Sequence, residues 1–280
     1  MLKLRDGIVE LYKKVATSIP PDVEEALRKA FETEEPGPAK ESLSRILENI
    51  KVARQSARPV CQDTGVPVFS IAAPKGLSHR ELIDTVREAT VIATSKVPLV
   101  PNAIDVVTGE NTGDNTGIGF PVIYLEETPD DTLRIDLILK DSGCEQAGRT
   151  YRLPEQSLNA GMNLEGVRRC VIDAVEKRRW SGCLPYIIGI GIGATDDQVV
   201  VLAKRQFFRK VHDYSEYPAI ADLEKTLLGE INALANGPAG SGKRTAALGV
   251  KIGINHRHTS SFSVHVSVSC WASRRARLIW

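Results

Sequence analysis

The sequence has no long apolar run, no excess of either charge and few aromatic residues. Its longest apolar stretch, LPYIIGIGIGA, falls well short of the roughly 20 residues that a membrane-spanning helix needs. With 36 basic and 35 acidic residues, the formal charge of +1 provides no global field to attract nucleic acid or an anionic membrane. The aromatic content of 5% leaves little material for stacking against bases. The composition therefore argues against a membrane protein and against a nucleic-acid-binding protein.

Cysteine is also scarce. The chain has 5 cysteines in 280 residues, too few and too scattered for a disulfide framework, so we expect reduced thiols. The N-terminal segment MLKLRDGIVELYKKVATSIP interleaves charged and apolar residues, which is typical of an amphipathic helix and unlike a signal peptide. These features predict a cytoplasmic protein.

Apolar periodicity predicts a mixture of helices and strands along the whole chain. Helices are expected within 3–57 and at 78–97, 163–179, 196–208 and 218–236. Strands are expected within 60–74 and at 121–126, 132–143, 183–193, 246–255 and 261–272. The segment 101–120 carries turn residues, including two NTG units. The pattern predicts an α/β (α+β) fold with mixed sheets flanked by helices, in a single domain over residues 1–280.

Two glycine-rich segments partly match nucleotide-binding motifs. GPAGSGKRT at 237–245 resembles a phosphate-binding loop, but Arg244 takes the Ser/Thr position and the segment runs from helix to strand. GIGIGATDD at 189–197 has the dinucleotide spacing, yet the acid expected about 20 residues later is represented only by Glu216. A tight strand-to-helix turn is the favoured interpretation of the second segment, and such a turn could still present amides to an anion.

Two histidines invite a metal interpretation. His256 and His258 are two residues apart, so on a strand they would share one face and could bind zinc. No second pair with zinc-ligand spacing is visible in the sequence. An acid, base or substrate-contact role for a histidine is at least as consistent with the pattern.

The cysteines are the more informative set. Cys170 lies inside an amphipathic helical pattern, where a thiol usually serves as a small buried hydrophobe. Cys61, Cys144, Cys183 and Cys270 instead occupy irregular positions, which suggests convergence on one cofactor. Soft thiolates suit an iron-sulfur cluster, and a 4Fe-4S cluster held by three thiolates leaves one iron open as a Lewis acid. That arrangement suits elimination of water, where a hydroxyl is polarised while a base takes a proton.

Five segments in order then resemble one known family. They are CQDTG at 61–65, NTGDNTGIGFP at 111–121, CLPYIIGIGIGAT at 183–195, ALANGPAGSGKRTAALGVKI at 233–252 and HRHTSSFSVHVSVSCWASRRA at 256–276. Over nearly its whole length the chain resembles the α subunit of the two-subunit iron-sulfur hydro-lyases, the class I fumarase and L-tartrate dehydratase family.

The resemblance implies a cofactor, a site and a partner. The family's three cluster ligands correspond to Cys61, Cys183 and Cys270, which would hold a 4Fe-4S cluster. Gln62 and Asp63 match residues that line the substrate site, and the family's active-site histidine corresponds to His258. The family completes its site with a β domain, so we expect a separate β subunit, a small dicarboxylate substrate and an α2β2-like oligomer.

Departures from the family pattern bear on the substrate. Val100 replaces an arginine expected to hold a substrate carboxylate, and Leu184 replaces the second proline of the C-P-P motif. Arg149 and Arg257 offer planar cations that could bind carboxylate instead. Together with Cys144, they favour the tartrate dehydratase branch, with fumarase left open.

Two alternatives to an iron-sulfur enzyme also remain. One is a noncatalytic relative that keeps the cluster for structure or for sensing iron and oxygen. The other is a thiol-dependent enzyme without metal.

Overall fold

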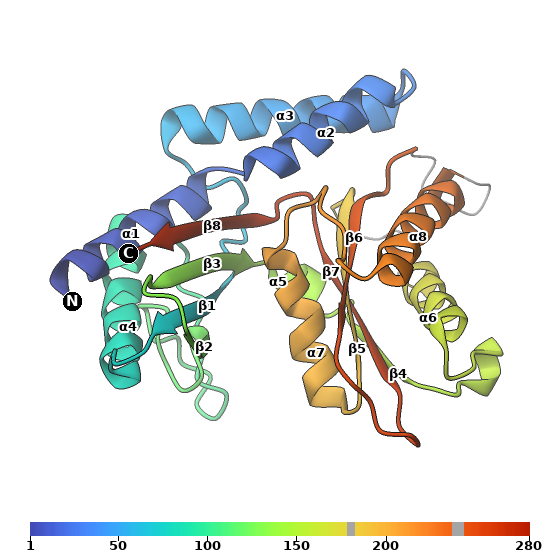
Figure 1. The fold of residues 1–280 in the computed structure, drawn as a ribbon. Helices are drawn as coiled ribbons and strands as arrows, with labels where there is room; N and C mark the ends of the chain where they lie inside the picture. The colour runs from blue at the N-terminus through green and yellow to red at the C-terminus, as the bar shows by residue number, and fades with distance from the viewer. Residues whose placement is uncertain (178–182, 237–243) are drawn as a thin grey trace. The chain divides into compact units, whose positions relative to one another are not determined.

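The computed structural model describes residues 1–177, 183–236 and 244–280. It contains helices and two four-stranded mixed sheets, which confirms the predicted fold class (Figure 1). The chain divides into two compact units: unit 1 comprises 1–20, 48–142 and 272–280, and unit 2 comprises 21–47 and 143–271. No helix in the described part of the chain combines the length and apolar character that crossing a membrane requires.

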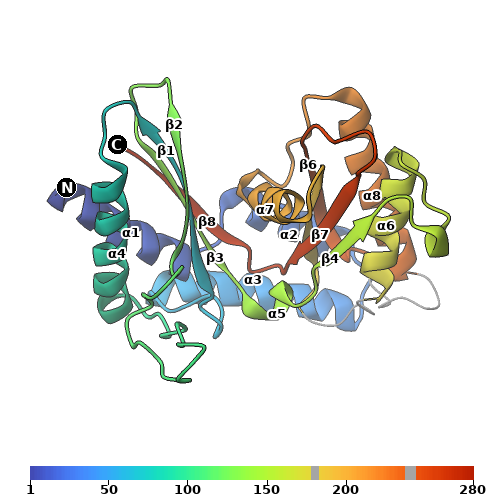
Figure 2. The ribbon, with the colours of Figure 1, turned by 90° about the horizontal axis from the view of Figure 1, so that it is seen from below.

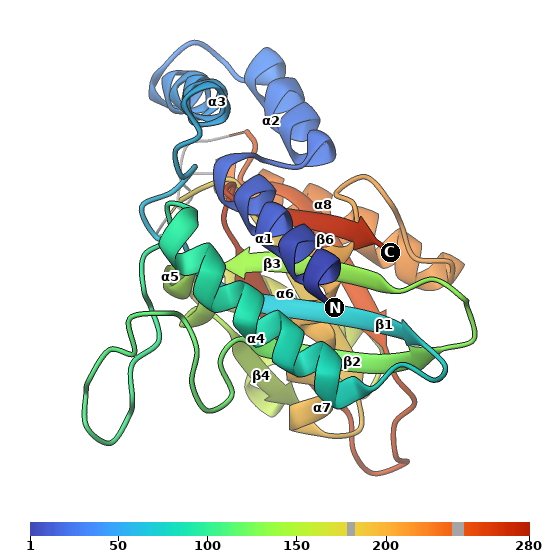
Figure 3. The same ribbon diagram turned by 90° about the vertical axis from the view of Figure 1, so that its left-hand side faces the viewer.

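Unit 1 is built on a sheet whose strand order is β2-β1-β3-β8. Its strands are β1 (Val66–Pro74), β2 (Val122–Thr128), β3 (Arg134–Lys140) and β8 (Arg274–Ile279). β1 pairs parallel with β2 and antiparallel with β3, which pairs antiparallel with β8. Helices α1 (Leu2–Thr17) and α4 (His79–Lys96) lie side by side over one face of this sheet (Figure 3).

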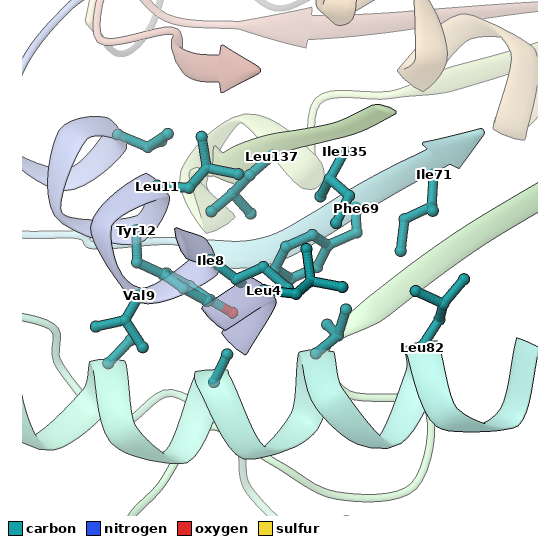
Figure 4. Close-up of a cluster of buried hydrophobic side chains, with 14 of the residues drawn as sticks. Leu4, Ile8, Val9, Leu11, Tyr12, Phe69, Ile71, Leu82, Ile135 and Leu137 are labelled. Atoms are coloured by element: carbon teal, nitrogen blue, oxygen red, sulfur yellow. The ribbon is translucent and has the colours of Figure 1, made fainter. Parts of the chain in front are cut away.

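The core of unit 1 lies between these two helices and the sheet (Figure 4). Alternate residues of β1 are buried, as expected for a strand with one face against a core. Tyr12 of α1 packs edge-on against Phe69 of β1, with ring centroids 5.7 Å apart. The Tyr12 hydroxyl lies 2.8 Å from the Thr90 hydroxyl, so its polar end is also paired inside the core.

The long connection from α4 to β2 consists of turns, as the sequence predicts. Asp105 and Asn111 accept hydrogen bonds from backbone amides two residues further along the chain. Buried Asn115, which has a positive φ of 59°, donates to the Val100 carbonyl and accepts from the Asn102 amide. These side chains replace a ladder of backbone hydrogen bonds, so the segment is ordered without regular secondary structure.

Unit 2 is built on a sheet of order β4-β7-β5-β6. Its strands are β4 (Arg149–Arg152), β5 (Tyr186–Gly193), β6 (Ala247–Ile254) and β7 (Ser263–Ser269). Helix α7 (Asp196–Arg205) covers one face, and α6 (Leu164–Lys177) and α8 (Pro218–Asn236) lie on the other (Figure 2). Every residue of β5 is buried because helices cover both of its faces.

The remaining elements connect this framework. Helix α2 is Pro21–Thr33, and α3 (Pro38–Ser56) continues from unit 2 into unit 1. A short helix, α5 (Ser142–Glu145), precedes β4, and the single turns η1 (Gln156–Leu158) and η2 (Gln206–Phe208) follow β4 and α7. The sequence pattern does not predict α5, β4 or β8.

The GIGIG segment of β5 has a packing role. A Cβ on Gly191 would lie 2.9 Å from the Ala203 nitrogen and closer still to the Val199 carbonyl oxygen, and one on Gly189 would meet the Ala203 carbonyl. The glycines therefore allow α7 to approach the sheet closely. The chain passes directly from β5 to α7, which begins after Thr195, so the favoured interpretation of a tight strand-to-helix turn is confirmed.

Most of the other glycine-rich motif, 237–243, lies outside the described residues. Of its described part, Arg244 has its guanidinium 2.8 Å from a Glu35 carboxylate oxygen, and its backbone amide donates to Glu34.

Candidate functional site

In unit 1, the CQDTG turn leads into β1 and is fixed by its aspartate. Oδ1 of Asp63 accepts the Gly65 amide at 2.8 Å, and Oδ2 accepts the Ser142 amide at 2.8 Å and its hydroxyl at 2.9 Å. Gly65 has φ = 81°, and a Cβ there would lie 2.7 Å from the Lys140 carbonyl oxygen, so the position requires glycine. The turn leaves Cys61 half-buried and Gln62 exposed.

A buried arginine holds the same turn from β8. The Arg274 guanidinium donates from Nη2 to the Asp63 carbonyl oxygen at 2.8 Å, and the residue is 0% exposed. Its Nε and Nη1 atoms are buried and have no hydrogen-bond partner among the described residues. Sequence reasoning missed this residue because an arginine in a strand is ordinarily an exposed one.

The position of the expected arginine, Val100, lies beside this turn. The Thr64 hydroxyl accepts the Val100 amide at 3.0 Å, and Asn102 donates from Nδ2 to the Gly65 carbonyl at 3.2 Å. The Val100 side chain is 48% exposed and carries no charge. The backbone at this position is therefore anchored to the turn, while its side chain offers nothing to a carboxylate.

In unit 2, the strand register brings two predicted ligands to one end of the sheet. Ile187 of β5 pairs with Ser269 of β7, so Cys183, which precedes β5, and Cys270, which follows β7, belong to the same end. Cys270 is buried and Cys183 is exposed. Cys144 of α5 is buried as well, and its sulfur lies within 4.8 Å of the Cys270 sulfur. The sequence had singled out Cys144 among the irregular thiols, but the family resemblance did not select it.

A pocket of about 490 Å³ is lined by the segment around Cys144, from Gly143 of α5 to Arg149 of β4, and by the last turn of α6. Its lining residues are Gly143, Gln146, Ala147, Gly148, Arg149, Ala174 and Lys177. The volume falls within the range of small-molecule sites. It contains the predicted carboxylate ligand Arg149, which is exposed and forms no ion pair within the described part of the chain.

The second cation of the pocket belongs to a polar chain. Lys177 Nζ lies 2.8 Å from Asp173 Oδ2, and the Tyr151 hydroxyl donates to the same oxygen at 2.7 Å. Burial, followed by this hydrogen bond to a carboxylate, raises the pKa of Tyr151, which therefore stays protonated as a donor. Asp173 neutralises Lys177 in part, so Arg149 is the stronger local centre of positive charge.

A buried histidine, His265, packs against the Gly148–Arg149 segment that lines the pocket. His265 of β7 has Nδ1 2.7 Å from the Thr150 hydroxyl, and a Cβ on Gly148 would lie 3.1 Å from its Nε2. Burial lowers the pKa of His265 to about 4; nearby Lys204 lowers it further, while Glu145 and Asp196 oppose the shift. His265 is therefore a neutral hydrogen-bonding residue that packs against the Gly148–Arg149 segment. It lies within the family-like segment 256–276, but nothing in the sequence singled it out.

The histidine and the second arginine of the predicted site lie elsewhere in unit 2. Arg257 and His258 are in the loop between β6 and β7, at the end of the sheet opposite Cys270. β7 is 7 residues long, so about 20 Å of strand separates this loop from Cys270. Within unit 2, the structure does not bring His258 to Cys183 and Cys270.

The loop has its own internal order. The Ser260 amide donates to His258 Nδ1 at 3.1 Å, so in the neutral ring the proton is on Nε2, which is then a donor. Arg257 donates to the His258 and Thr259 carbonyls and stacks over Phe262, 5.0 Å from the ring centroid. Among the described residues, no third metal-ligating side chain joins the histidine pair that the sequence raised as a zinc candidate.

Cys170 has the structural role that its helical position predicted. It is fully buried in α6, and burial raises its pKa to about 12. A thiol with such a pKa is neither a nucleophile nor a metal ligand at neutral pH.

Comparison with known proteins supports one family. The family model for fumarate hydratase (Fumerase) matches residues 5–279. A Geobacillus stearothermophilus protein provisionally named fumarate hydratase class I is 40% identical over 98% of this chain, which spans only 54% of that protein. A Methanocaldococcus jannaschii protein provisionally named L(+)-tartrate dehydratase subunit alpha is 35% identical, with 98% of this chain and 96% of that protein covered. The L(+)-tartrate dehydratase subunit alpha of Escherichia coli K12 is 30% identical, with 99% and 90% covered. The chain belongs to the fumarate hydratase family.

Proposed function

We propose that this chain is the α subunit of a 4Fe-4S hydro-lyase that reversibly eliminates water from a hydroxy-dicarboxylate. The substrate pair is L-tartrate and oxaloacetate, or malate and fumarate. Family membership and the names of the relatives support the reaction class. The observation that carries the proposal is the grouping, in unit 2, of buried Cys270 with Cys183 at one sheet end and of an arginine-lined pocket on the segment after Cys144.

The residues present suit an iron-sulfur cluster. We assign its ligands to Cys61 in the CQDTG turn, Cys183 just before β5 and Cys270 just after β7. The buried guanidinium of Arg274 donates to the turn that carries Cys61, and its Nε and Nη1 have no hydrogen-bond partner among the described residues; this supports a bound negative charge there. When bound, such a cluster supplies an iron with an open position, a Lewis acid for a hydroxyl and a carboxylate. Cys144 is the competing ligand to exclude, because its sulfur is near that of Cys270.

Recognition of the dicarboxylate falls to the pocket. Arg149 presents a planar fork that can bind one carboxylate through two hydrogen bonds, and Lys177 adds a second positive charge at the rim. This clamp replaces the arginine absent at Val100. The difference in clamp is consistent with a substrate other than fumarate, and it keeps L-tartrate as our first choice.

The CQDTG turn presents the polar groups that act on the substrate. The Asp63 carboxylate accepts three hydrogen bonds from Gly65 and Ser142, which fixes its orientation. The exposed amide of Gln62 follows the thiol directly and can donate to a substrate oxygen. We assign Gln62 and Asp63 to orienting the substrate and moving its proton.

The position of His258 bears on assembly. About 20 Å of β7 separates its loop from Cys270, so His258 cannot reach the substrate of its own unit 2. We therefore assign His258, with Arg257 beside it, to the site of a second copy in an α2β2-like oligomer. Its Nε2 proton, fixed by the Ser260 amide on the other nitrogen, would then be the group offered to substrate.

The relatives that this chain covers almost completely are named as α subunits, which supports a separate β subunit as its partner. We accordingly expect this chain alone to be inactive, and the low thiol count suits a reducing compartment such as the cytoplasm.

The decisive test is anaerobic co-expression with a β subunit, followed by analysis of iron and sulfide and assays for dehydration of L-tartrate and malate and for hydration of fumarate. Cys61→Ser, Cys183→Ser and Cys270→Ser should each abolish cluster binding, whereas Cys170→Ser should not. Loss of the cluster in Cys144→Ser together with its survival in one of the other three would refute the ligand assignment. A stable cluster with no activity on any of these acids would favour the noncatalytic, iron- or oxygen-sensing alternative. A protein that stays colourless without air would favour a metal-free thiol enzyme.

A further inference from the structure

The most unusual charged group in the described part of unit 1 is Arg274 of β8. Arginine stays charged at any pH at which the protein is folded, and burying an unpaired charge is strongly unfavourable. Arg274 is 0% exposed, yet within the described part of the chain its Nη2 donates to a neutral carbonyl, that of Asp63. Nε and Nη1 have no partner among the described residues.

The neighbouring carboxylates do not neutralise this charge. The Asp63 carboxylate accepts hydrogen bonds from Gly65 and Ser142. The guanidinium of Arg274 is hydrogen-bonded to the backbone carbonyl of Asp63 instead. Asp141, also buried, lies 4.0 Å from Lys140, a second buried cation at the end of the adjacent strand. No ion pair joins Arg274 to an acid within the described residues.

Another arginine of β8, Arg277, provides a comparison, because its charge is paired within the polypeptide. Arg277, three residues later on the same strand, is half-exposed, and its guanidinium is 2.7 Å and 3.1 Å from the two carboxylate oxygens of Asp136. Arg274 is fully buried, and no carboxylate of the described residues pairs with it. Its burial is therefore explained only if a negative charge that is absent from the polypeptide itself is bound nearby.

We propose that Arg274 is the internal counter-charge of the thiolate-bound iron-sulfur cluster and positions the Cys61–Asp63 turn for it. The guanidinium is bonded to the residue two positions after Cys61, and complete burial excludes a freely exchanging solute as its regular partner. A cluster held by thiolates is a permanently bound anion, and hydrogen bonds and charge around it tune its stability. This inference rests on the proposed function, since it assumes that the cluster is present.

The proposal predicts opposite effects of one substitution in the two states of the protein. In the cluster-free chain, Arg274→Met removes an uncompensated buried charge at similar volume, so the urea midpoint should stay equal to the wild type or rise. In the cluster-loaded complex with the β subunit, the same variant should release iron to a chelator at least about tenfold faster, as other losses of outer-shell partners do. Arg274→Lys keeps the charge but not the planar fork, so its rate of iron release should lie between those of the wild type and Arg274→Met.

Arg277→Met is the matched control on the same strand, and it should leave iron release unchanged. Release of iron from Arg274→Met at the wild-type rate would overturn the proposal. This holds even if the variant has a raised KM for the dicarboxylate, because the arginine would then act on the substrate and not on the cluster. A clear fall in the urea midpoint of the cluster-free variant would also overturn it, since the role would then be structural. Failure of the wild type to take up iron and sulfide would instead refute the proposed function from which this inference starts.

Discussion

The close packing of α7 on β5 makes Gly191→Ala a sharp test of the structure of unit 2. The new Cβ would lie 2.9 Å from the Ala203 nitrogen and closer still to the Val199 carbonyl oxygen, whereas ordinary contacts are 3.4–4 Å. Both atoms belong to the helix backbone, so the whole helix has to move rather than one side chain. Overpacking of this kind costs about 1–3 kcal/mol. We expect the upper part of that range, about 2 to 3 kcal/mol, a large share of the total stability of a domain.

The assay is urea unfolding of the cluster-free chain followed by circular dichroism, with the slope of the transition checked for constancy. Gly229→Ala is the matched control: Gly229 lies within α8, where a Cβ would meet no atom within 4 Å. That variant should gain about 0.5–1 kcal/mol, because alanine favours the helix. A Gly191→Ala protein within about 0.5 kcal/mol of the wild type would refute the close approach of α7, since that is the range of neutral surface substitutions.

Three further predictions concern the pocket and the thiols. Arg149→Met should lower kcat/KM for the dicarboxylate about 10- to 100-fold, because the charged hydrogen bonds are lost, with little change in melting temperature. The control Arg152→Met, on the same strand, should leave kcat/KM unchanged. Equal losses of kcat/KM in both variants would contradict the role of the pocket. Because the pKa of His265 is lowered to about 4, the unfolded chain binds its proton first as the pH falls, so stability should decline from about pH 6.5 towards pH 4, by up to about 3 kcal/mol. His265→Gln should flatten that part of the pH profile of urea midpoints, and an unchanged profile would show that the histidine is not buried in its neutral form. In alkylation followed by mass spectrometry, exposed Cys183 of the cluster-free chain should react well before Cys170, whose pKa is raised to about 12; early labelling of Cys170 would contradict its burial.

Periodicity was sufficient to predict most of the fold, because the regular elements keep their apolar residues on one face. β1 alternates buried and half-buried residues, and β5 is an apolar run bounded by turns, so both strands could be predicted. β8 could not, because its sequence RRARLI begins with an arginine that is buried rather than exposed. β4 and α5 are 4 residues each, too short for periodicity to be measured.

The candidate site was predictable to a lesser degree. Residue type and motif pointed to Cys61, Cys183, Cys270 and Arg149. In the structure, Cys183 and Cys270 belong to one sheet end and Arg149 lines a pocket. Separation in space was not predictable: His258 is 12 residues before Cys270 in the sequence, but the extended strand between them carries it away. Positioning residues such as His265, although it lies within the segment 256–276, could not be singled out from the sequence because their role is defined only by what packs against them.

The strand register of unit 2 links its stability to its proposed chemistry. Cys183 and Cys270 belong to one end of the sheet only because Ile187 pairs with Ser269, and a slip of one residue in β7 would turn Cys270 to the opposite face. The register is held by helices on both faces, and on the α7 side the approach depends on glycine at positions 189 and 191. A substitution that lifts α7 therefore loosens β5, which follows Cys183 and pairs with β7, the strand that precedes Cys270. In this fold the GIGIG segment, which resembles a nucleotide-binding motif, therefore helps to hold the strand register that places Cys183 and Cys270 at one end of the sheet.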